Sequence, residues 1–397
     1  MGRRENTSGR RAGGGIQAFF APCPRGIEAM LGEELTGVGA QAVTPVPGGV
    51  SFVGPFDLCY RVNLESRTAS RVLWRVFHGV YRNEQDVYTA SAGLPWGQWF
   101  SAERTIKVKV SARDCPLKSL DFVTLRIKDA VCDAFSAAAG ARPSVDTRQP
   151  DIRIDAFLDQ TRLTLYLDTS GEALFKRGYR KGGGDAPLRE NLAAGILRLS
   201  GWDGRQPLLD PMCGSGTFLI EAAQMARRIV PGLGRRFAFE QFNGFDQQAW
   251  QRLCDASAAQ QQGNAPLAIF GGDRSAAVLQ AARANLEAAG LADAVTLQQG
   301  DVLDLTPPAA EGVLVTNPPY GVRTGELADL AEFYPRLGDV LKQRFAGWRV
   351  YLFTGDLRLP KLIGLSPSRR IPLFNGPLEC RLYEFRIVRG SMRRGGH

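Results

Sequence analysis

Apolar and polar residues alternate along several short runs in the first half of the chain. Thr105–Val110, Asp151–Phe157 and Arg162–Leu167 each follow this pattern, which is typical of half-buried strands. The short connection Asp159–Thr161 predicts that the second and third of these strands form a hairpin. Apolar residues at helical spacing predict a helix over Ser119–Ala139. We therefore expect a small antiparallel sheet with helices on one face.

The second half alternates short apolar runs with helical segments, a pattern that predicts a parallel sheet. Helices are expected at Thr217–Ile229 and Ala276–Ala289, and a hairpin around Asn375-Gly376. The expected strands are Leu208–Leu209, Leu267–Phe270, Val295–Leu297, Val313–Thr316 and Arg349–Phe353. The predicted fold class is α/β, with a Rossmann-like domain preceded by a smaller α+β module.

Stretches poor in apolar residues mark the expected boundaries between these parts. Residues 1–15 are rich in arginine and glycine and predict a disordered tail, and Gly182–Gly184 predicts a linker. The segment Pro231–Asn264 has the composition of a loop-rich insertion. The expected order is a tail (1–15), two N-terminal regions (16–104 and 105–181), a C-terminal domain (185–390) and a second basic tail (391–397).

The composition is that of a globular protein, with 44% hydrophobic and 22% charged residues among 397. No run of about 18 apolar residues is present, so we expect no membrane partner. The N-terminus lacks the apolar core of a signal peptide, which makes the cytoplasm the expected location. The seven cysteines form no C-x-x-C pair and the chain has two histidines, so we expect neither a metal site nor disulfides.

The formal charge of +9 is concentrated at the two ends of the chain. Residues 1–11 and 389–397 carry +3 each, which leaves +3 for the body between them. Basic tails attract polyanions such as RNA, but they can equally be solubilising ends. The charge is therefore compatible with an RNA partner without requiring one, and it does not indicate an oligomeric state.

A glycine-rich turn follows the expected strand at Leu208–Leu209 and leads into a helix. Glycines let a backbone approach a ligand closely, and a helix N-terminus offers free N–H groups. The turn lacks the full G-x-G-x-x-G of dinucleotide-binding folds, and it begins with an acid. An acid would repel a pyrophosphate but attract the ammonium group of a methionine moiety, which favours S-adenosyl-L-methionine over NAD. The cofactor-binding residues predicted here are Asp210, Pro211, Cys213, Gly214, Gly216 and Thr217. We interpret Cys213 as a packing residue rather than a nucleophile.

Two further acids follow the next expected strands. Asp273 can accept hydrogen bonds from ribose hydroxyls, as acids do at this place in nucleotide-binding folds. Asp301, with the backbone of Val302, can contact an adenine amine. Each acid alone is weak evidence, because exposed aspartates after strands are common. Three acids at one edge of a parallel sheet together predict a nucleotide cofactor.

The sequence Asn317-Pro318-Pro319-Tyr320 follows an apolar strand. An exocyclic amine on a base is a poor nucleophile, because its lone pair is delocalised into the ring. The side-chain oxygen of Asn317 and the carbonyl of Pro318 can accept the amine hydrogens and favour a pyramidal nitrogen. Two prolines stiffen the loop, and Tyr320 can stack on the base. The motif therefore predicts methyl transfer to an exocyclic amine, with Asn317, Pro318, Pro319 and Tyr320 as the catalytic residues; a rigid turn without chemistry is the alternative.

These motifs resemble those of class I amino-methyltransferases, and the first half is similar to the THUMP RNA-binding module with a ferredoxin-like companion before it. Together they resemble the THUMP-containing RNA guanine-N2 methyltransferases, above all the N-terminal half of the bacterial bifunctional enzymes of large-subunit ribosomal RNA. The likeness is carried by Gly48–Phe52, Leu174–Arg180, Asp210–Thr217 and Asn375–Leu378. The resemblance implies guanine N2 of ribosomal RNA as the acceptor, and it implies that Glu190 contacts the cofactor. It also implies a ferredoxin-like region at 16–104, a THUMP region at 105–181 and a methyltransferase domain at 185–390.

Several alternatives stay open at this level. The Asn-Pro-Pro-Tyr chemistry fits an adenine-N6 methyltransferase of RNA or DNA equally well, and a transfer-RNA guanine-N2 enzyme would carry the same motifs. A catalytically dead RNA-binding or chaperone protein is the alternative outside the enzymes. The intact acidic and Asn-Pro-Pro-Tyr positions argue against that last reading.

Overall fold

The computed structural model describes residues 15–180, 188–263, 265–319 and 324–388. Several expectations lie outside these residues, namely the two tails, the linker at Gly182–Gly184 and the position of Tyr320. The chain divides into two compact units. The first comprises 15–23, 31–174 and 232–256, and the second comprises 24–30, 175–231 and 257–388.

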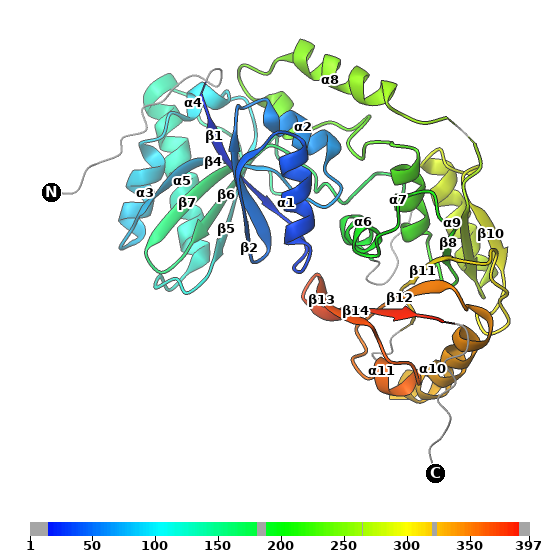
Figure 1. Ribbon diagram of the computed structural model, residues 1–397. Coiled ribbons are helices and arrows are strands. Elements are labelled where there is room, and N and C mark those ends of the chain that lie inside the picture. Colours follow the sequence, from blue (N-terminus) through cyan, green and yellow to red (C-terminus); the bar gives the residue numbers. More distant parts are fainter. Residues whose placement is uncertain (1–14, 181–187, 264, 320–323, 389–397) are drawn as a thin grey trace. The chain divides into compact units, whose positions relative to one another are not determined.

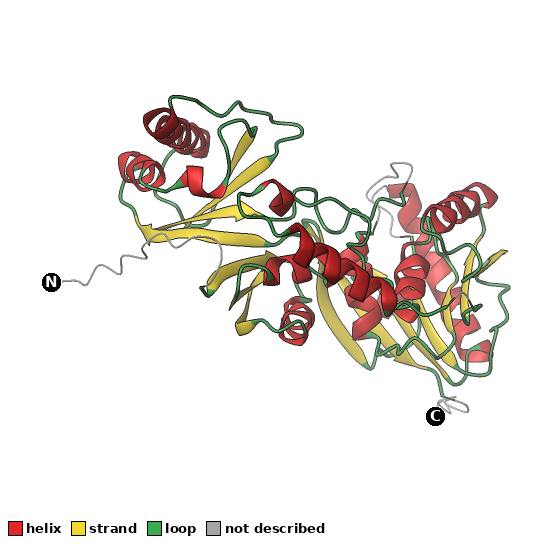
Figure 2. Ribbon diagram, turned by 90° about the horizontal axis from the view of Figure 1, so that it is seen from above, coloured by secondary structure: helices red, strands yellow, loops and turns green. Residues whose placement is uncertain are grey.

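A single seven-stranded sheet forms the centre of the first unit, in the order β2-β3-β1-β4-β7-β6-β5. Its strands are β1 (Gln17–Pro22), β2 (Gln41–Val46), β3 (Gly49–Gly54), β4 (Leu73–Val80), β5 (Ile106–Ala112), β6 (Ile152–Leu158) and β7 (Arg162–Asp168). Its helices are α1 (Glu28–Gly37), α2 (Leu58–Glu65), α3 (Glu84–Ala92), α4 (Trp96–Trp99) and α5 (Leu120–Ala139). Helices α3 and α5 contact each other and are labelled in Figure 1; Figure 2 shows the helices and strands of the chain in separate colours.

The pairing of β4 with β7 joins the two N-terminal regions into this one sheet. One row of buried side chains crosses the join, because Phe19 pairs with Trp74, Trp74 with Leu167 and Leu167 with Ile154. The predicted hairpin of β6 and β7 is confirmed. The expectation of a purely antiparallel sheet is wrong, since β5 pairs parallel to β6. The 20-residue helix α5 between them is long enough for the crossover that parallel pairing needs.

Residues 232–256 pack on the first unit, although they lie within the range expected for the C-terminal domain. The segment carries a 3-10 turn (η1, Ala238–Gln241) and most of a 13-residue helix, α8 (Gln247–Ala259), so it is more ordered than the loop-rich insertion expected. Phe239 is fully buried, with its ring centroid 4.5 Å from Tyr60 and 5.1 Å from Trp250. These aromatic contacts hold the segment 232–256 on the first unit.

A second seven-stranded sheet runs through the second unit in the order β10-β9-β8-β11-β12-β14-β13. The strands are β8 (Leu208–Asp210), β9 (Ile269–Asp273), β10 (Thr296–Gln299), β11 (Gly312–Thr316), β12 (Trp348–Thr354), β13 (Arg369–Asn375) and β14 (Leu378–Arg386). Strands β8 to β12 are parallel, and β14 runs antiparallel to β12 and β13. The fold class predicted from sequence, a Rossmann-like domain preceded by an α+β module, is confirmed.

Helices cover both faces of this sheet. On one face, α7 (Thr217–Ala226) packs against β9. Leu219 lies so close to Gly271 of β9 that a Cβ added at Gly271 would clash with it. On the other face, α10 (Thr324–Arg344) and α11 (Leu359–Leu362) form a hydrophobic core with β11 and β12. Figure 1 shows these two helices on the same side of β12. The remaining helices are α6 (Glu190–Leu199) and α9 (Ala276–Ala288). Among the described residues, no helix is both long and apolar enough to cross a membrane.

The predicted strand positions in this half are shifted in two cases. The strand expected at Leu267–Phe270 runs instead over Ile269–Asp273, and the strand expected at Val295–Leu297 becomes Thr296–Gln299. The predicted helix Thr217–Ile229 ends at Ala226. Glycines and glutamines at the ends of β9 and β10 weaken the apolar signal there, yet parallel pairing extends the strands across them.

We predict that Phe239→Ala lowers the free energy of unfolding by about 3–5 kcal/mol, because it leaves a cavity among buried rings. Urea denaturation followed by tryptophan fluorescence measures this change. Phe122→Ala is the control, since the Phe122 side chain is 50% exposed and its loss should change stability by less than about 0.5 kcal/mol. Equal midpoints for the two variants would contradict the packing role of Phe239.

Candidate active site

Strand order places the predicted site at the point where the second sheet changes direction. From β8 the chain runs outward to β9 and β10, and it then returns to pair β11 with the other side of β8. Ligands of open α/β sheets bind at the carboxyl ends of strands at such a switch point. Asp210 ends β8 and Thr316 ends β11, so both lie at this place.

A short hydrogen bond ties the two strand ends together. Thr316 Oγ1 donates to Asp210 Oδ1 over 2.6 Å, and Met212 N donates to the same oxygen over 3.3 Å. Burial, together with the negative charge of Asp273, raises the pKa of Asp210 to about 7, although the two hydrogen-bond donors act to lower it. The glycine turn after β8 and the Asn-Pro-Pro loop after β11 therefore begin side by side.

The glycine turn is held by its own backbone and by Asp273. Cys213 N donates to Gly272 O over 2.8 Å, and Gly214 N donates to Asp273 Oδ2 over 3.2 Å. Gly214 and Gly216 have φ values of 54° and 83°, a region that favours glycine. A Cβ on Gly214 would meet no atom within 4 Å, so the turn leaves open space beside its backbone. Such a turn at the start of α7 can accept a ligand.

The thiol of Cys213 is buried within this turn. Burial raises the pKa of Cys213, and the negative charges of Asp210 and Asp273 raise it further. A thiol with a raised pKa gives little thiolate at neutral pH. This environment supports the interpretation of Cys213 as a packing residue.

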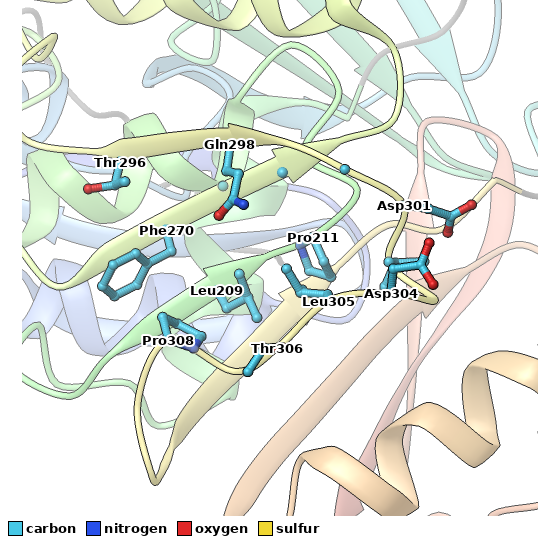
Figure 3. Close-up of a pocket in the computed structure, with 14 residues that line it drawn as sticks. Leu209, Pro211, Phe270, Thr296, Gln298, Asp301, Asp304, Leu305, Thr306 and Pro308 are labelled. Carbon is cyan, nitrogen blue, oxygen red and sulfur yellow. The ribbon is translucent and has the colours of Figure 1, made fainter.

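A cavity of about 270 Å³ opens on the face of the sheet beside this edge (Figure 3). Residues 300–311, which connect β10 to β11, form a loop rather than a helix, and the cavity lies between this loop and the sheet. Figure 3 shows Asp301 and Asp304 at one end and Phe270, Thr296 and Pro308 at the other. The cavity combines an apolar floor with a polar rim, which suits a flat heteroaromatic ring.

Three of the predicted cofactor residues line this cavity, namely Pro211, Asp301 and Val302. Val302 is buried, whereas Asp301 is exposed and its Oδ1 accepts from Leu303 N over 2.9 Å. Asp273 is not among the lining residues; it ends β9 and accepts from Ser275 N over 3.0 Å.

Glu190 reaches the glycine turn through Arg180, a residue that the sequence motifs alone did not single out. Arg180 Nη2 lies 3.1 Å from Glu190 Oε1 and donates to Thr217 Oγ1 over 3.0 Å. Burial raises the pKa of Glu190, and the positive charge of Arg180 opposes this shift. Thr217 directly follows Gly216, so the structure brings Glu190 and Thr217 into one polar cluster.

A second ion pair lies behind this cluster, fully buried. Arg177 Nε donates to Glu221 Oε1 over 3.0 Å, and the two side chains are 2% and 0% exposed. The only sequence signal for this pair was a charge in the apolar run Thr217–Ala223. Removing one partner of such a pair leaves a buried charge and costs about 3–5 kcal/mol.

Asn317, Pro318 and Pro319 follow β11 directly, and Tyr320 lies outside the described residues. Asn317 Oδ1 is buried and accepts no hydrogen bond within the described part of the chain. Buried oxygens are normally hydrogen-bonded, so an unused acceptor at a switch point suits a substrate donor. Tyr334 Oη of α10 donates to Pro319 O over 3.1 Å and fixes the far end of the described loop. Neither helical spacing nor composition indicated this role for Tyr334.

Comparison with known proteins shows which families match the chain. Models of three domain families match the chain: an RlmL ferredoxin-like domain at residues 18–73, a THUMP domain at 81–168 and an RMKL-like methyltransferase domain at 177–384. The fold and the site thus define a class I methyltransferase domain that follows a THUMP module in the sequence. The chain belongs to the RMKL-like methyltransferase family, which confirms the resemblance inferred from sequence.

Three similar proteins illustrate this family. A protein of Synechocystis sp., named provisionally as an RNA methyltransferase, is 40% identical over 93% of this chain and 96% of its own length. The ribosomal RNA large subunit methyltransferase K/L of Aeromonas hydrophila is 38% identical over 95% of this chain, which spans 55% of that relative. The crystal structure of SMU.472 in complex with S-adenosylhomocysteine has a TM-score of 0.86 and 29% identity, and covers 94% of this chain and 99% of its own.

We predict that Tyr334→Phe loosens the Asn-Pro-Pro loop by removing one hydrogen bond worth about 1 kcal/mol. Burial raises the pKa of Tyr334 to about 12, so its hydroxyl stays a donor at neutral pH. Hydrogen exchange of the backbone amides of residues 312–317 should become faster. Tyr351→Phe is the control, because Tyr351 is a buried tyrosine of the neighbouring strand β12, whereas the hydrogen bond to Pro319 O comes from Tyr334. Unchanged exchange in Tyr334→Phe would refute the anchoring role.

Proposed function

We propose that this protein is an S-adenosyl-L-methionine-dependent RNA methyltransferase that modifies the exocyclic N2 amine of a guanine in large-subunit ribosomal RNA. The THUMP module and the names of its relatives support RNA as the substrate. The complex of SMU.472 supports the cofactor. Guanine N2 follows from the resemblance to the guanine-N2 enzymes.

The observation that carries the chemistry is the unused oxygen of Asn317. Asn317 Oδ1 is buried and accepts no hydrogen bond among the described residues, and it follows a strand end fixed by the Thr316–Asp210 hydrogen bond. In this proposal Asn317 Oδ1 and the Pro318 carbonyl accept the two hydrogens of the guanine amine. The pyramidal amine then directs its lone pair out of the ring plane. Because the prolines hold both acceptors in place, little reorganisation accompanies the reaction.

The described residues fit the cofactor by their donors, acceptors and space. The cavity of about 270 Å³ has an apolar floor of Leu209, Phe270 and Leu305 that suits adenine, with Asp301 and Val302 at its rim. Asp273 would accept from the ribose hydroxyls, and Asp210 from the ammonium group. Pro211, Cys213, Gly214, Gly216 and Thr217 form the turn beside them, and Glu190 lies next to it through Arg180. When bound, S-adenosylmethionine supplies an electrophilic methyl group.

Substrate delivery completes the proposal. A guanine within a structured RNA must leave its stack to reach Asn317, at a cost of a few kcal/mol. The expected stacking of Tyr320 on the base would offset about 1–3 kcal/mol of this cost. Binding of RNA by the THUMP module would supply the rest.

A tritium-transfer assay tests the reaction and the base together. Large-subunit ribosomal RNA, transfer RNA and duplex DNA are each incubated with the protein and methyl-labelled S-adenosylmethionine, and the products are digested to nucleosides. The proposal predicts label in N2-methylguanosine from ribosomal RNA. Label in N6-methyladenine, or in transfer RNA alone, would assign the enzyme to one of the alternative substrates.

Asn317→Ala should keep its affinity for S-adenosylmethionine and lose turnover by about 100-fold, as expected when one preorganised hydrogen-bonding group is removed. Asn317→Asp keeps an acceptor oxygen and should retain more activity than the alanine variant. Equilibrium dialysis with the cofactor and single-turnover rates with RNA separate the two effects. A cofactor-binding defect as large as the rate defect would remove Asn317 from the proposed role.

The affinity for S-adenosylmethionine should rise with pH up to about 7 and then level off. The pKa of Asp210 is about 7, well above its ordinary value of 3.8, so below pH 7 the carboxyl is mostly protonated. An ammonium ligand needs the carboxylate, and binding must then release a proton. Affinity should therefore change by up to about tenfold per pH unit below this pKa.

Calorimetric titrations between pH 5.5 and 7.5 measure this dependence. Asp210→Asn should bind more weakly and show a flat profile over the same range. A wild-type affinity that falls as the pH rises would contradict the assignment of Asp210 to the ammonium group.

A further inference from the structure

A second cavity, of about 400 Å³, lies in the second unit outside the cofactor cavity. Its walls come from the segment 175–180, from the start of α6 and from the turn Asn375–Pro377 between β13 and β14. The segments Leu174–Arg180 and Asn375–Leu378 both carry the family likeness, and their residue patterns predict no role for either. The fold brings these two segments together.

The walls of this cavity carry an excess of positive charge. Lys176, Arg180 and Arg189 line it together with one acid, Glu190. Glu190 is already paired with Arg180, at 3.1 Å, so its charge is balanced within the wall. Arg189 is exposed, and its charge faces the cavity.

Arg189 is held in place for such a ligand. Its guanidinium carbon lies 5.0 Å from the centre of the Phe175 ring, a cation–π contact. The turn at Gly376 approaches the guanidinium of Arg189 closely: a Cβ added at Gly376 would lie 3.4 Å from Arg189 Nη2. The Arg189 guanidinium makes no hydrogen bond or ion pair with another described residue, and its side chain does not cap α6, so its N–H groups are available as donors. A stacked guanidinium of this kind suits a phosphate.

The basic surface continues beyond the cavity along the same turn. Arg25 stacks on Phe374, with its guanidinium carbon 4.3 Å from the ring centre, and Phe374 N donates to Arg25 O over 3.2 Å. Phe374 lies next to Asn375 of the cavity wall. Arg189 and Arg25 therefore form a basic surface along which the phosphate backbone of an RNA strand can lie.

Arg180 connects this cavity to the proposed active site. It lines the cavity, and its Nη2 donates to Thr217 Oγ1 directly after the glycine turn. A ligand in the cavity is thus held beside the site of methyl transfer. The phosphates of an RNA strand lie within one nucleotide of its target base, so a strand that delivers a base to Asn317 brings its backbone close to this region.

We propose that the cavity lined by Phe175, Lys176 and Arg189 binds a nucleotide that flanks the target base in the substrate RNA. This inference rests on the proposed function. The phosphate contacts Arg189, and the sugar and base occupy the apolar part of the cavity at Leu188 and Pro377. The contact holds the strand while the target base is out of its stack.

The test compares Arg189→Ala with Arg283→Ala in the full chain. Arg283 is an exposed arginine of α9 that takes no part in the cavity, and its removal changes the net charge equally. Arg189 caps α6 without a side-chain hydrogen bond, so its replacement should leave the fold intact. Affinity for end-labelled large-subunit ribosomal RNA is measured over a range of KCl concentrations, and affinity for S-adenosylmethionine is measured in parallel.

Arg189→Ala should weaken RNA binding about tenfold, the loss expected for one charge-assisted hydrogen bond. The slope of log affinity against log salt should fall by about 1, as expected for one lost phosphate contact. The KM for RNA should rise with kcat and cofactor affinity unchanged, and Arg189→Lys should recover part of the binding. Arg283→Ala should match the wild type.

Three outcomes would overturn the inference. RNA binding by Arg189→Ala could equal that of Arg283→Ala, or the defect could fall on the affinity for S-adenosylmethionine. Inorganic phosphate could also bind in an Arg189-dependent way while RNA affinity stays unchanged, which would identify a site for free phosphate. Failure of the proposed function is distinguishable, because label on a base other than guanine leaves the binding comparison intact.

Discussion

The hydrogen bond from Thr316 to Asp210 is the contact on which the arrangement of the site depends. It joins the ends of two neighbouring parallel strands that lie 106 residues apart in sequence. The loops that follow these strands must therefore start together, whatever the chain does between them. One loop turns back on glycines, and the other is stiffened by prolines and by Tyr334. A glycine turn with open space beside its backbone and a stiff acceptor loop thus share one edge of the sheet.

Behind this edge, two arginines and two glutamates form a balanced group of charges that is largely buried. Arg177 pairs with Glu221, and Arg180 pairs with Glu190. Buried ion pairs contribute little net stability, because desolvation offsets their attraction. Their value here is geometric: they fix the segment before α6 against α7, beside the glycine turn. The segment that they hold in place forms one wall of the basic cavity that we assign to RNA.

Sequence patterns predicted the elements that carry strong local signals. The alternating runs of β6 and β7 and the cap of α5 are local properties, since Ser119 accepts from Phe122 N and Gly140 adopts a φ of 66°. Elements with weak local signals were predicted less accurately. The ends of β9 and β10 were misplaced because pairing with neighbours, and not their own composition, extends them. The parallel pairing of β5 with β6 and the packing of Phe239 on the first unit involve distant partners, which no local pattern records.

The sequence by itself determined which chemical groups are present and in what local geometry: an acid before a glycine turn, two prolines after an asparagine, and acids after strands. These features depend on neighbours a few residues away, and backbone stereochemistry restricts them strongly. Only the tertiary structure decided which groups meet. It joined Asp210 to Thr316, brought Arg180 to Glu190 and Thr217, left Asn317 Oδ1 buried without a described partner, and combined two distant segments into a basic cavity. The reason is that strand order and burial arise from packing over the whole sheet.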